Sequence, residues 1–200
     1  MPMIPILLLA AGASSRMGGT DKLMTPVHGQ PLLRRSAKVA CAAGNGPVLV
    51  ALPPAPHPRH GALDGLDLIP VEVGNAAEGM NASLRALLAA IPGPADAVMV
   101  LLADLPDLTA EDLNLVLQSV DTTSETLIWR GVNAAGKPGH PVVFSARLVP
   151  ELAALTGDGG AQSVVRRHRD HVALIPLPND HALRDLDTPE DWAAWQRDHG

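Results

Sequence analysis

Short, uninterrupted apolar runs recur along this chain and alternate with longer segments of helical spacing. Residues 97–102 (AVMVLL) form the clearest run, and residues 4–9 form another. Such runs are typical of strands that are buried on both faces of a sheet. Between them, residues 79–90 repeat leucine at helical intervals. Because parallel strands need crossover connections, the alternation predicts an α/β fold, a three-layer α/β/α sandwich around a mostly parallel, Rossmann-like sheet.

The remaining elements follow from the same patterns. Strands are predicted at 4–9, 48–52, 68–71, 97–102, 126–129, 141–144 and 171–175, and helices at 31–43, 79–90, 109–120, 146–155, 161–168 and 189–196. Residues 53–60 hold four prolines and are expected to form an irregular, exposed loop. Residues 131–139 are expected to form a Gly-rich turn. The length of 200 residues fits one domain covering 1–200.

Charge and composition exclude several kinds of partner. The chain has 15 basic and 21 acidic residues, and its aromatic residues are one Phe, three Trp and no Tyr. We therefore expect no nucleic-acid partner, because such proteins need a basic surface or aromatic side chains that stack on bases. The apolar run at 4–11 is too short to span a bilayer, and no basic stretch precedes it, so we expect a cytoplasmic protein without a membrane partner. The single cysteine, Cys41, is expected in the core.

The loop after the first strand carries the strongest chemical signal. Residues 7–22 read LLLAAGASSRMGGTDK, so small residues follow the strand and two cations, Arg16 and Lys22, come after them. Small residues let backbone N–H groups approach an anion, and ligands of α/β sheets bind at the carboxyl ends of the strands. The segment suits a triphosphate, although it is neither a P-loop nor a dinucleotide fingerprint. The alternative is a Gly-rich surface turn with solvated charges.

This segment resembles the signature of the nucleoside triphosphate transferases, and among them the MobA-like NTP transferase domain of the molybdenum-cofactor nucleotidyltransferases. The resemblance implies the sheet of the nucleotide-diphospho-sugar transferase type. It also implies that Arg16 and Lys22, together with Asp104, are catalytic. The implied nucleotide-binding residues of the loop are Leu9, Ala10, Ala11, Gly12 and Lys22.

Residues 75–84 (NAAEGMNASL) resemble a segment of the cytidylyltransferases in this family. The resemblance implies that Asn75, Gly79 and Ser83 also bind the nucleotide, with the start of the helix presenting N–H groups. Relatives often have Gly where Asn81 stands. The alternative is a helix N-terminus with ordinary capping.

Two aspartates are candidate metal ligands. Asp104 follows the strand at 97–102 within an Asp-Leu-Pro turn, where a carboxylate can coordinate Mg²⁺. The alternative is an acidic turn residue. Near the C-terminus, Thr188 and Pro189 form a good helix start by themselves, but this does not require the preceding Asp187. The resemblance implies that Asp104 and Asp187 together hold Mg²⁺.

Gly139-His140-Pro141 matches a Gly-His-Pro pattern of the molybdopterin enzymes in the family. The resemblance implies that Gly139, His140 and Pro141 lie beside the acceptor substrate, and residues 157–161 resemble a second loop near the acceptor. The alternatives are a structural histidine and a simple turn between helices.

These matches predict a Mg²⁺-dependent enzyme that transfers CMP from CTP to the phosphate of molybdopterin, a phosphorylated pterin, and releases pyrophosphate. Leu9-Ala10-Ala11-Gly12 favours CTP, because relatives that use GTP usually have Leu-Ala-Gly-Gly. With few aromatics, the base is expected to be read by backbone groups and polar side chains. Three alternatives stay open: a GTP-using enzyme, a sugar-phosphate or polyol-phosphate acceptor, and a non-catalytic nucleotide-binding protein. We also expect transient contact with a molybdoenzyme or its chaperone.

Overall fold

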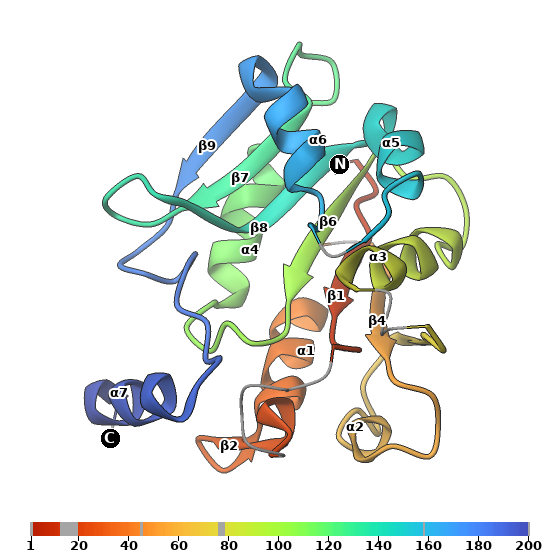
Figure 1. Cartoon of the computed structure of the whole chain (residues 1–200). Helices are drawn as coiled ribbons and strands as arrows, with labels where there is room; N and C mark the ends of the chain where they lie inside the picture. Colours follow the sequence, from red (N-terminus) through yellow and green to blue (C-terminus); the bar gives the residue numbers. More distant parts are fainter. Residues whose placement is uncertain (1, 13–19, 45, 76–78, 158, 200) are drawn as a thin grey trace.

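A computed structural model describes residues 2–12, 20–44, 46–75, 79–157 and 159–199. Its centre is a seven-stranded sheet with the order β5-β4-β1-β6-β8-β7-β9. The strands are β1 (Ile6–Leu9), β4 (Val48–Leu52), β5 (Ile69–Glu72), β6 (Ala97–Leu102), β7 (Ile128–Val132), β8 (Pro138–Ser145) and β9 (Val172–Pro176). In Figure 1 the arrowheads of β1, β4 and β6 point down, so their carboxyl ends share one edge of the molecule.

The sheet is mixed, with a parallel half that carries the site. Strands β5, β4, β1 and β6 run parallel to one another, whereas β8 is antiparallel to both β6 and β7. At the far edge, β9 is parallel to β7. The predicted mostly parallel α/β fold is confirmed, and β8 is the strand that departs from it because it follows β7 through a tight connection rather than a helical crossover.

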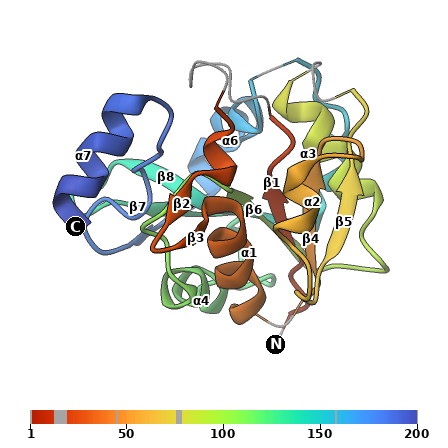
Figure 2. The ribbon, with the colours of Figure 1, turned by 90° about the horizontal axis from the view of Figure 1, so that it is seen from below.

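Helices cover both faces of the sheet. The helices are α1 (Leu32–Ala42), α2 (Pro58–Gly61), α3 (Met80–Ala89), α4 (Ala110–Gln118), α5 (Val149–Ala153), α6 (Gln162–Arg167) and α7 (Pro189–His199). Figure 2 shows α1 and α4 on one side of the sheet and α3 and α6 on the other. The chain therefore forms the predicted three layers.

The core divides into two clusters because successive residues of a strand point to opposite faces. In β6, Met99 and Leu101 pack toward α1 and α4, and Val98 and Val100 pack toward α3. All four are almost fully buried. The continuous apolar run of β6 is thus explained by burial on both faces.

Several local predictions need correction. The proline-rich segment contains the short helix α2, with His57 as its N-cap and Pro58 in its first turn. Strands β7 and β8 extend into the expected turn at 131–139, which leaves only 133–137 between them. A small hairpin of β2 (Pro26–Val27) and β3 (Gln30–Pro31) was not predicted. These elements are short, and their apolar pattern is too brief to stand out in the sequence.

Cys41 is exposed, so the prediction of a core position is wrong. It lies near the end of α1, and its thiol contacts the carbonyl oxygen of Asp67 at 3.5 Å. Partial burial and the nearby Asp67 charge raise the pKa of the thiol. A raised pKa keeps the thiol protonated at neutral pH, which makes it a poor nucleophile.

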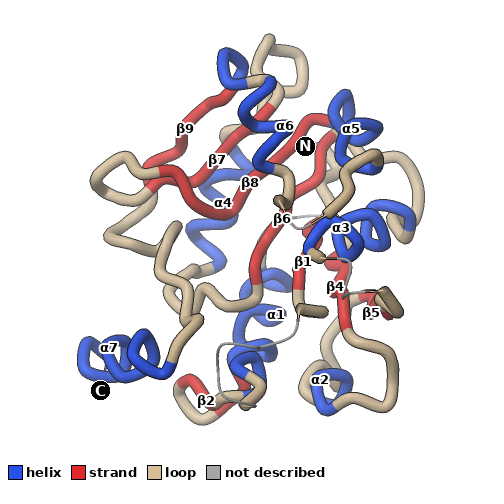
Figure 3. The backbone as a smooth tube through the Cα atoms, in the orientation of Figure 1, coloured by secondary structure: helices blue, strands red, loops and turns tan. Residues whose placement is uncertain are grey.

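The C-terminal segment before α7 is joined to β8 and to the end of β6. The backbone N–H of His140 donates to the carbonyl of Ala182 at 2.8 Å, and Leu186 donates to the carbonyl of Asp104 at 3.2 Å. Gly139 permits this approach, since a Cβ atom there would lie 1.9 Å from the Ala182 oxygen. Figure 3 shows the loop leading into α7 beside the end of β6. Within the described ranges, no helix has the length and apolar character needed to cross a bilayer.

Gly139→Ala should push this segment away from β8. A backbone oxygen cannot yield as a flexible side chain can, so we expect a loss of about 1–3 kcal/mol in the free energy of unfolding. Urea denaturation followed by circular dichroism measures it. Gly61→Ala is the matched control, because a Cβ atom at Gly61 meets nothing within 4 Å. Equal unfolding midpoints for the two variants would contradict the steric argument.

Candidate functional site

Three charged side chains from distant parts of the chain meet at the carboxyl end of the parallel strands. The Lys22 ammonium donates to Asp104 Oδ2 at 2.6 Å and also to Asp187 Oδ1. Lys22 and Asp104 are 16% and 17% exposed, and Asp187 is 26% exposed. The sequence-predicted Lys22, Asp104 and Asp187 are therefore adjacent. We call them the Lys22 cluster.

The turn that carries Asp104 is held by helix α1. Ser36 Oγ donates to the carbonyl of Ala103 at 2.9 Å, and Arg35 Nε donates to the carbonyl of Pro106 at 2.8 Å. Ser36 is buried, so its hydroxyl is satisfied by this bond in the interior. These two contacts fix the direction in which the strand end presents Asp104.

Asp187 is held by the start of α7. Thr188 and Asp191 form reciprocal side-chain to backbone bonds, and the Asp187 N–H also donates to Asp191 Oδ2 at 3.2 Å. The hydrogen bonds from Thr188 lower the pKa of the Asp191 carboxyl, so it remains a charged acceptor. Helix capping thus accounts for the roles of Thr188 and Asp191, as the sequence indicated. Among the residues that the structure describes, the Asp187 carboxylate takes no part in the cap and accepts from Lys22 instead.

Electrostatics keep Lys22 positively charged. Burial acts to lower the pKa of the ammonium, but the charges and hydrogen bonds of Asp104 and Asp187 outweigh it, so the pKa is raised. Asp185, which sequence reasoning missed, lies near the same group. Burial and the charges of Asp104 and Asp187 raise the pKa of its carboxyl. Negative charge is in excess here, which favours a further cation.

The residues present fit a divalent metal. Asp104 Oδ1 is buried and has no hydrogen-bond partner in the described part of the chain. Carboxylate oxygens are the ligands that Mg²⁺ prefers, and Mg²⁺ is commonly held by one or two carboxylates plus substrate phosphates. Among the described residues, no group of three or more His, Cys, Asp or Glu side chains is arranged to hold a metal alone. Asp104 and Asp187 therefore fit a divalent ion whose remaining ligands come from elsewhere.

Arg59 of α2 joins the two ends of the loop after β1, and sequence reasoning did not find it. Its guanidinium donates to both carboxylate oxygens of Asp21, at 2.7 and 2.8 Å. It also donates to the carbonyls of Ala10 at 2.6 Å and Gly12 at 2.9 Å. Arg59 is only 3% exposed. Such a bidentate, buried ion pair has a specific geometry. It fixes the position of Asp21, which directly precedes Lys22 in the chain.

The other predicted nucleotide-binding residues surround the same strand ends. Ala10 and Ala11 are buried directly after β1, whereas Gly12 is exposed. Gly79 is the N-cap of α3 with φ +98°, a conformation that favours glycine. Ser83 is buried within α3, and Asn75 is exposed in the turn after β5. Arg16 lies outside the described residues, as does Asp158 of the 157–161 loop.

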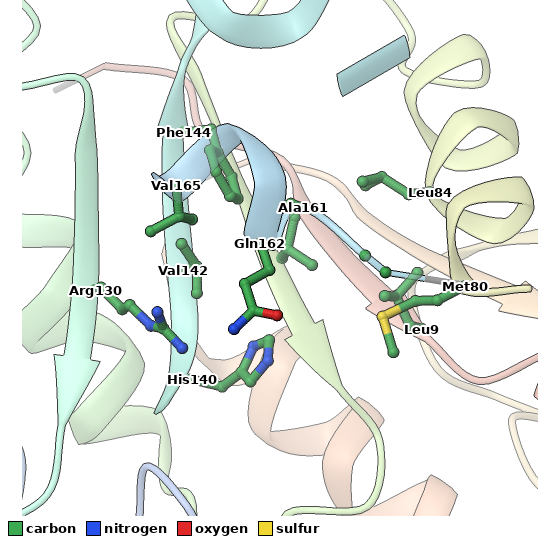
Figure 4. Close-up of a pocket in the computed structure, with 13 residues that line it drawn as sticks. Leu9, Met80, Leu84, Arg130, His140, Val142, Phe144, Ala161, Gln162 and Val165 are labelled. Carbon is green, nitrogen blue, oxygen red and sulfur yellow. The ribbon is translucent and has the colours of Figure 1, made fainter. Parts of the chain in front are cut away.

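A pocket of about 210 Å³ opens between α3, α6 and strands β1, β6, β7 and β8. Figure 4 shows Arg130, His140 and Gln162 gathered at one end of it, with Val142, Phe144 and Val165 beside them. The lining also includes Leu9, Met80, Leu84, Val100, Gly159, Gly160 and Ala161. Of the predicted acceptor residues, His140 lines this pocket, whereas Gly139 and Pro141 flank it in β8.

The His140 imidazole is neutral at physiological pH. Burial lowers its pKa to about 4, a hydrogen bond with the Val100 backbone opposes the shift, and the nearby Arg130 charge adds to it. The charge of Asp104 acts in the opposite direction. Val142 of β8 pairs with Val100 of β6, so His140 lies toward the end of β6 that leads to Asp104. His140 Nδ1 is buried without a hydrogen-bond partner in the described part of the chain.

His140 should make the folded state sensitive to acid. Its pKa is below the usual 6.5, so the unfolded chain binds this proton more tightly and stability falls as pH drops from 6.5 toward about 4. The loss between pH 7 and 5 should be on the order of 2 kcal/mol. Urea unfolding at both pH values measures it. Between pH 7 and 5, His140→Gln should lose less free energy of unfolding than wild type. The exposed control His171→Gln should lose as much as wild type. Equal losses in all three proteins would refute the argument.

Comparison with known proteins agrees with this geometry. The profile of the MobA-like NTP transferase domain matches residues 6–172. A probable molybdenum cofactor guanylyltransferase of Nostoc sp. is 28% identical over 98% of this chain and 92% of that protein. The purine catabolism protein PucB of Bacillus subtilis is 27% identical over 96% of this chain and 95% of that protein.

Solved structures give the same result. Rv0371c of Mycobacterium tuberculosis H37Rv matches with a TM-score of 0.81 at 31% identity, over 98% of each chain. A complex of the same protein with manganese matches with a TM-score of 0.77 at 28% identity, over 97% of each chain. The chain therefore belongs to the MobA-like NTP transferase domain family and is a nucleotidyltransferase.

Proposed function

We propose that this enzyme transfers the nucleotidyl group of a nucleoside triphosphate to the phosphate of a molybdopterin-type pterin and releases pyrophosphate. The observation that carries the proposal is the Lys22 cluster, a lysine between two carboxylates beside a loop of small residues. The name of the Nostoc relative supports the molybdenum-cofactor acceptor. Membership in a nucleotidyltransferase family speaks against the non-catalytic alternative.

The proposed reaction is an in-line displacement. An oxygen of the acceptor phosphate attacks the α-phosphorus, a new P–O bond forms, and the bond to the bridging oxygen of the β-phosphate breaks. Such transfers depend on positioning and on stabilisation of charge rather than on a covalent intermediate. Lys22 stays protonated and places its positive charge against the phosphate oxygens, while the loop that Arg59 positions supplies backbone N–H groups.

Asp104 and Asp187 are the proposed metal ligands. A bound Mg²⁺ would neutralise phosphate charge and help to align the triphosphate. The manganese complex of Rv0371c supports a divalent ion in this family. The unpartnered oxygen of Asp104 is the structural support in this chain.

For the nucleotide we propose CTP. Ala11 carries a methyl group where relatives that use GTP usually have glycine, and it is only 5% exposed, so its bulk is fixed against the end of β1. A fixed methyl group reduces the room for a purine. GTP is the second candidate, because the Nostoc relative is named a guanylyltransferase.

Lys22→Ala should reduce kcat/KM for pyrophosphate release about 10²–10³-fold, because it removes a preorganised charge that stabilises the transferring phosphate. The assay uses CTP, Mg²⁺ and molybdopterin. Exposed Lys38→Ala is the control and should keep wild-type rates. Circular dichroism of Lys22→Ala checks that the fold survives. Full pyrophosphate release by folded Lys22→Ala would remove Lys22 from the mechanism.

The base preference is tested by thermal-shift titration with CTP, GTP and ATP, each with and without Mg²⁺. We expect the largest rise in Tm with CTP and Mg²⁺, because at a fixed ligand concentration a tighter ligand of the native state stabilises it more. Ala11→Gly should reduce the difference between the Tm rises that CTP and GTP cause, because a purine then has more room. A clear preference of wild type for GTP would overturn the CTP assignment and leave the enzyme class intact.

A further inference from the structure

Arg130 is a partly buried cation that has no carboxylate partner among the described residues. Its Nε donates to the carbonyl of Gly139 at 2.9 Å, and one terminal nitrogen donates to the carbonyl of Pro138 at 3.4 Å. Both partners are neutral, and no acidic side chain pairs with Arg130 in the described part of the chain. Desolvation lowers the pKa of the guanidinium, yet an arginine stays charged in proteins. Charge removed from water in this way is stabilised when an anion binds.

Two neutral polar groups lie beside Arg130 in the pocket. His140 presents a buried Nδ1 that has no partner in the described part of the chain, and the amide of Gln162 lies at the same end (Figure 4). Because the imidazole is neutral, it adds no second positive charge. Among the described residues, the pocket therefore offers one positive charge with neutral hydrogen-bonding groups beside it, which is complementary to one compact anionic group.

The rest of the pocket is apolar. Val142, Phe144 and Val165 line it near Arg130, and Leu9 and Met80 line it toward α3. At about 210 Å³ it is smaller than the roughly 300 Å³ of an ordinary small-molecule site, so it can enclose only part of a ligand. Apolar walls favour a flat or apolar body over a polyol, whose hydroxyl groups would lose their water without finding partners.

We propose that Arg130, with His140 and Gln162, is the subsite that selects the acceptor by its charge and accepts an anionic group attached to an apolar or planar body. The inference rests on the proposed function and deepens it. It favours a phosphorylated heterocycle over a sugar or polyol phosphate, and it excludes uncharged acceptors. Because Val142 of β8 pairs with Val100 of β6, His140 lies toward the carboxyl end of β6, after which Asp104 follows.

The test measures binding without turnover. The probes are a fluorescent pterin that carries a phosphate monoester and the same pterin without the phosphate, each titrated into the full-length protein. Wild type should bind the phosphorylated probe at least about tenfold more tightly, in line with one charge-assisted contact. Arg130→Met should lose this preference and Arg130→Lys should recover part of it. Equal binding of both probes by wild type would overturn the inference.

Controls separate the subsite from the fold and from the nucleotide site. Arg147→Met removes an exposed arginine and should keep the wild-type preference. The Tm rise with CTP and Mg²⁺ should be the same in wild type and Arg130→Met. If Arg130→Met does not fold, Gln162→Leu replaces an exposed side chain and should weaken the phosphorylated probe several-fold. If a folded Arg130 variant and Gln162→Leu both bind the phosphorylated probe as wild type does, the proposed subsite is wrong.

A separate turnover assay distinguishes the two proposals. Pyrophosphate release by wild type with molybdopterin and CTP or GTP tests the proposed function. Absence of release, together with an Arg130-dependent preference for the phosphorylated probe, would reject the function and retain the subsite. Release with an acceptor KM that Arg130→Met leaves unchanged would reject the subsite and retain the function.

Discussion

The contact of Lys22 with Asp104 and Asp187 is the constraint on which the rest of the site depends. Asp104 lies 82 positions after Lys22 in the chain, and Asp187 lies 165 positions after it. One ammonium therefore joins the loop after β1, the end of β6 and the segment before α7. Removing one partner of such a partly buried group would leave the other charges without compensation, which is costly. Every neighbouring contact, from Ser36 on the Ala103 carbonyl to the cap at Thr188, serves to keep these groups in place.

Much of the fold could be read from the sequence, and the reason is burial. Strands at 48–52 and 97–102 have the predicted bounds because their apolar runs end where the strands leave the core. The position of β8 between β6 and β7 could not be predicted, since strand order depends on contacts between segments that no local pattern records. Cys41 was misjudged because an apolar residue near a helix end can face solvent.

The residues of the candidate site also divide into those that the sequence predicted and those that only the structure showed. Lys22, Asp104 and Asp187 could be named beforehand because each occupies a motif position with a chemical purpose. Arg59 and Arg130 could not be named, because their importance comes from their surroundings. Arg59 joins the two ends of a loop, and Arg130 lines a pocket in which no described acidic side chain pairs with it. The shortage of aromatic residues led us to expect that the base is not bound by stacking. All three Trp residues, Trp129, Trp192 and Trp195, are buried in the core, and Phe144 lines the pocket.

Arg59 has a consequence for how this protein can change over time. Asp21 lies 38 positions away, yet it accepts two hydrogen bonds from a guanidinium that is almost wholly enclosed. Replacing Asp21 alone would leave the enclosed guanidinium without its counterion, and replacing Arg59 alone would leave Asp21 and the carbonyls of Ala10 and Gly12 without their donor. Intermediates in which only one residue has changed should therefore be unfit. The two positions are therefore expected to vary together across descendants of this chain. The proline-rich segment that carries Arg59 should therefore change in evolution together with the loop after β1.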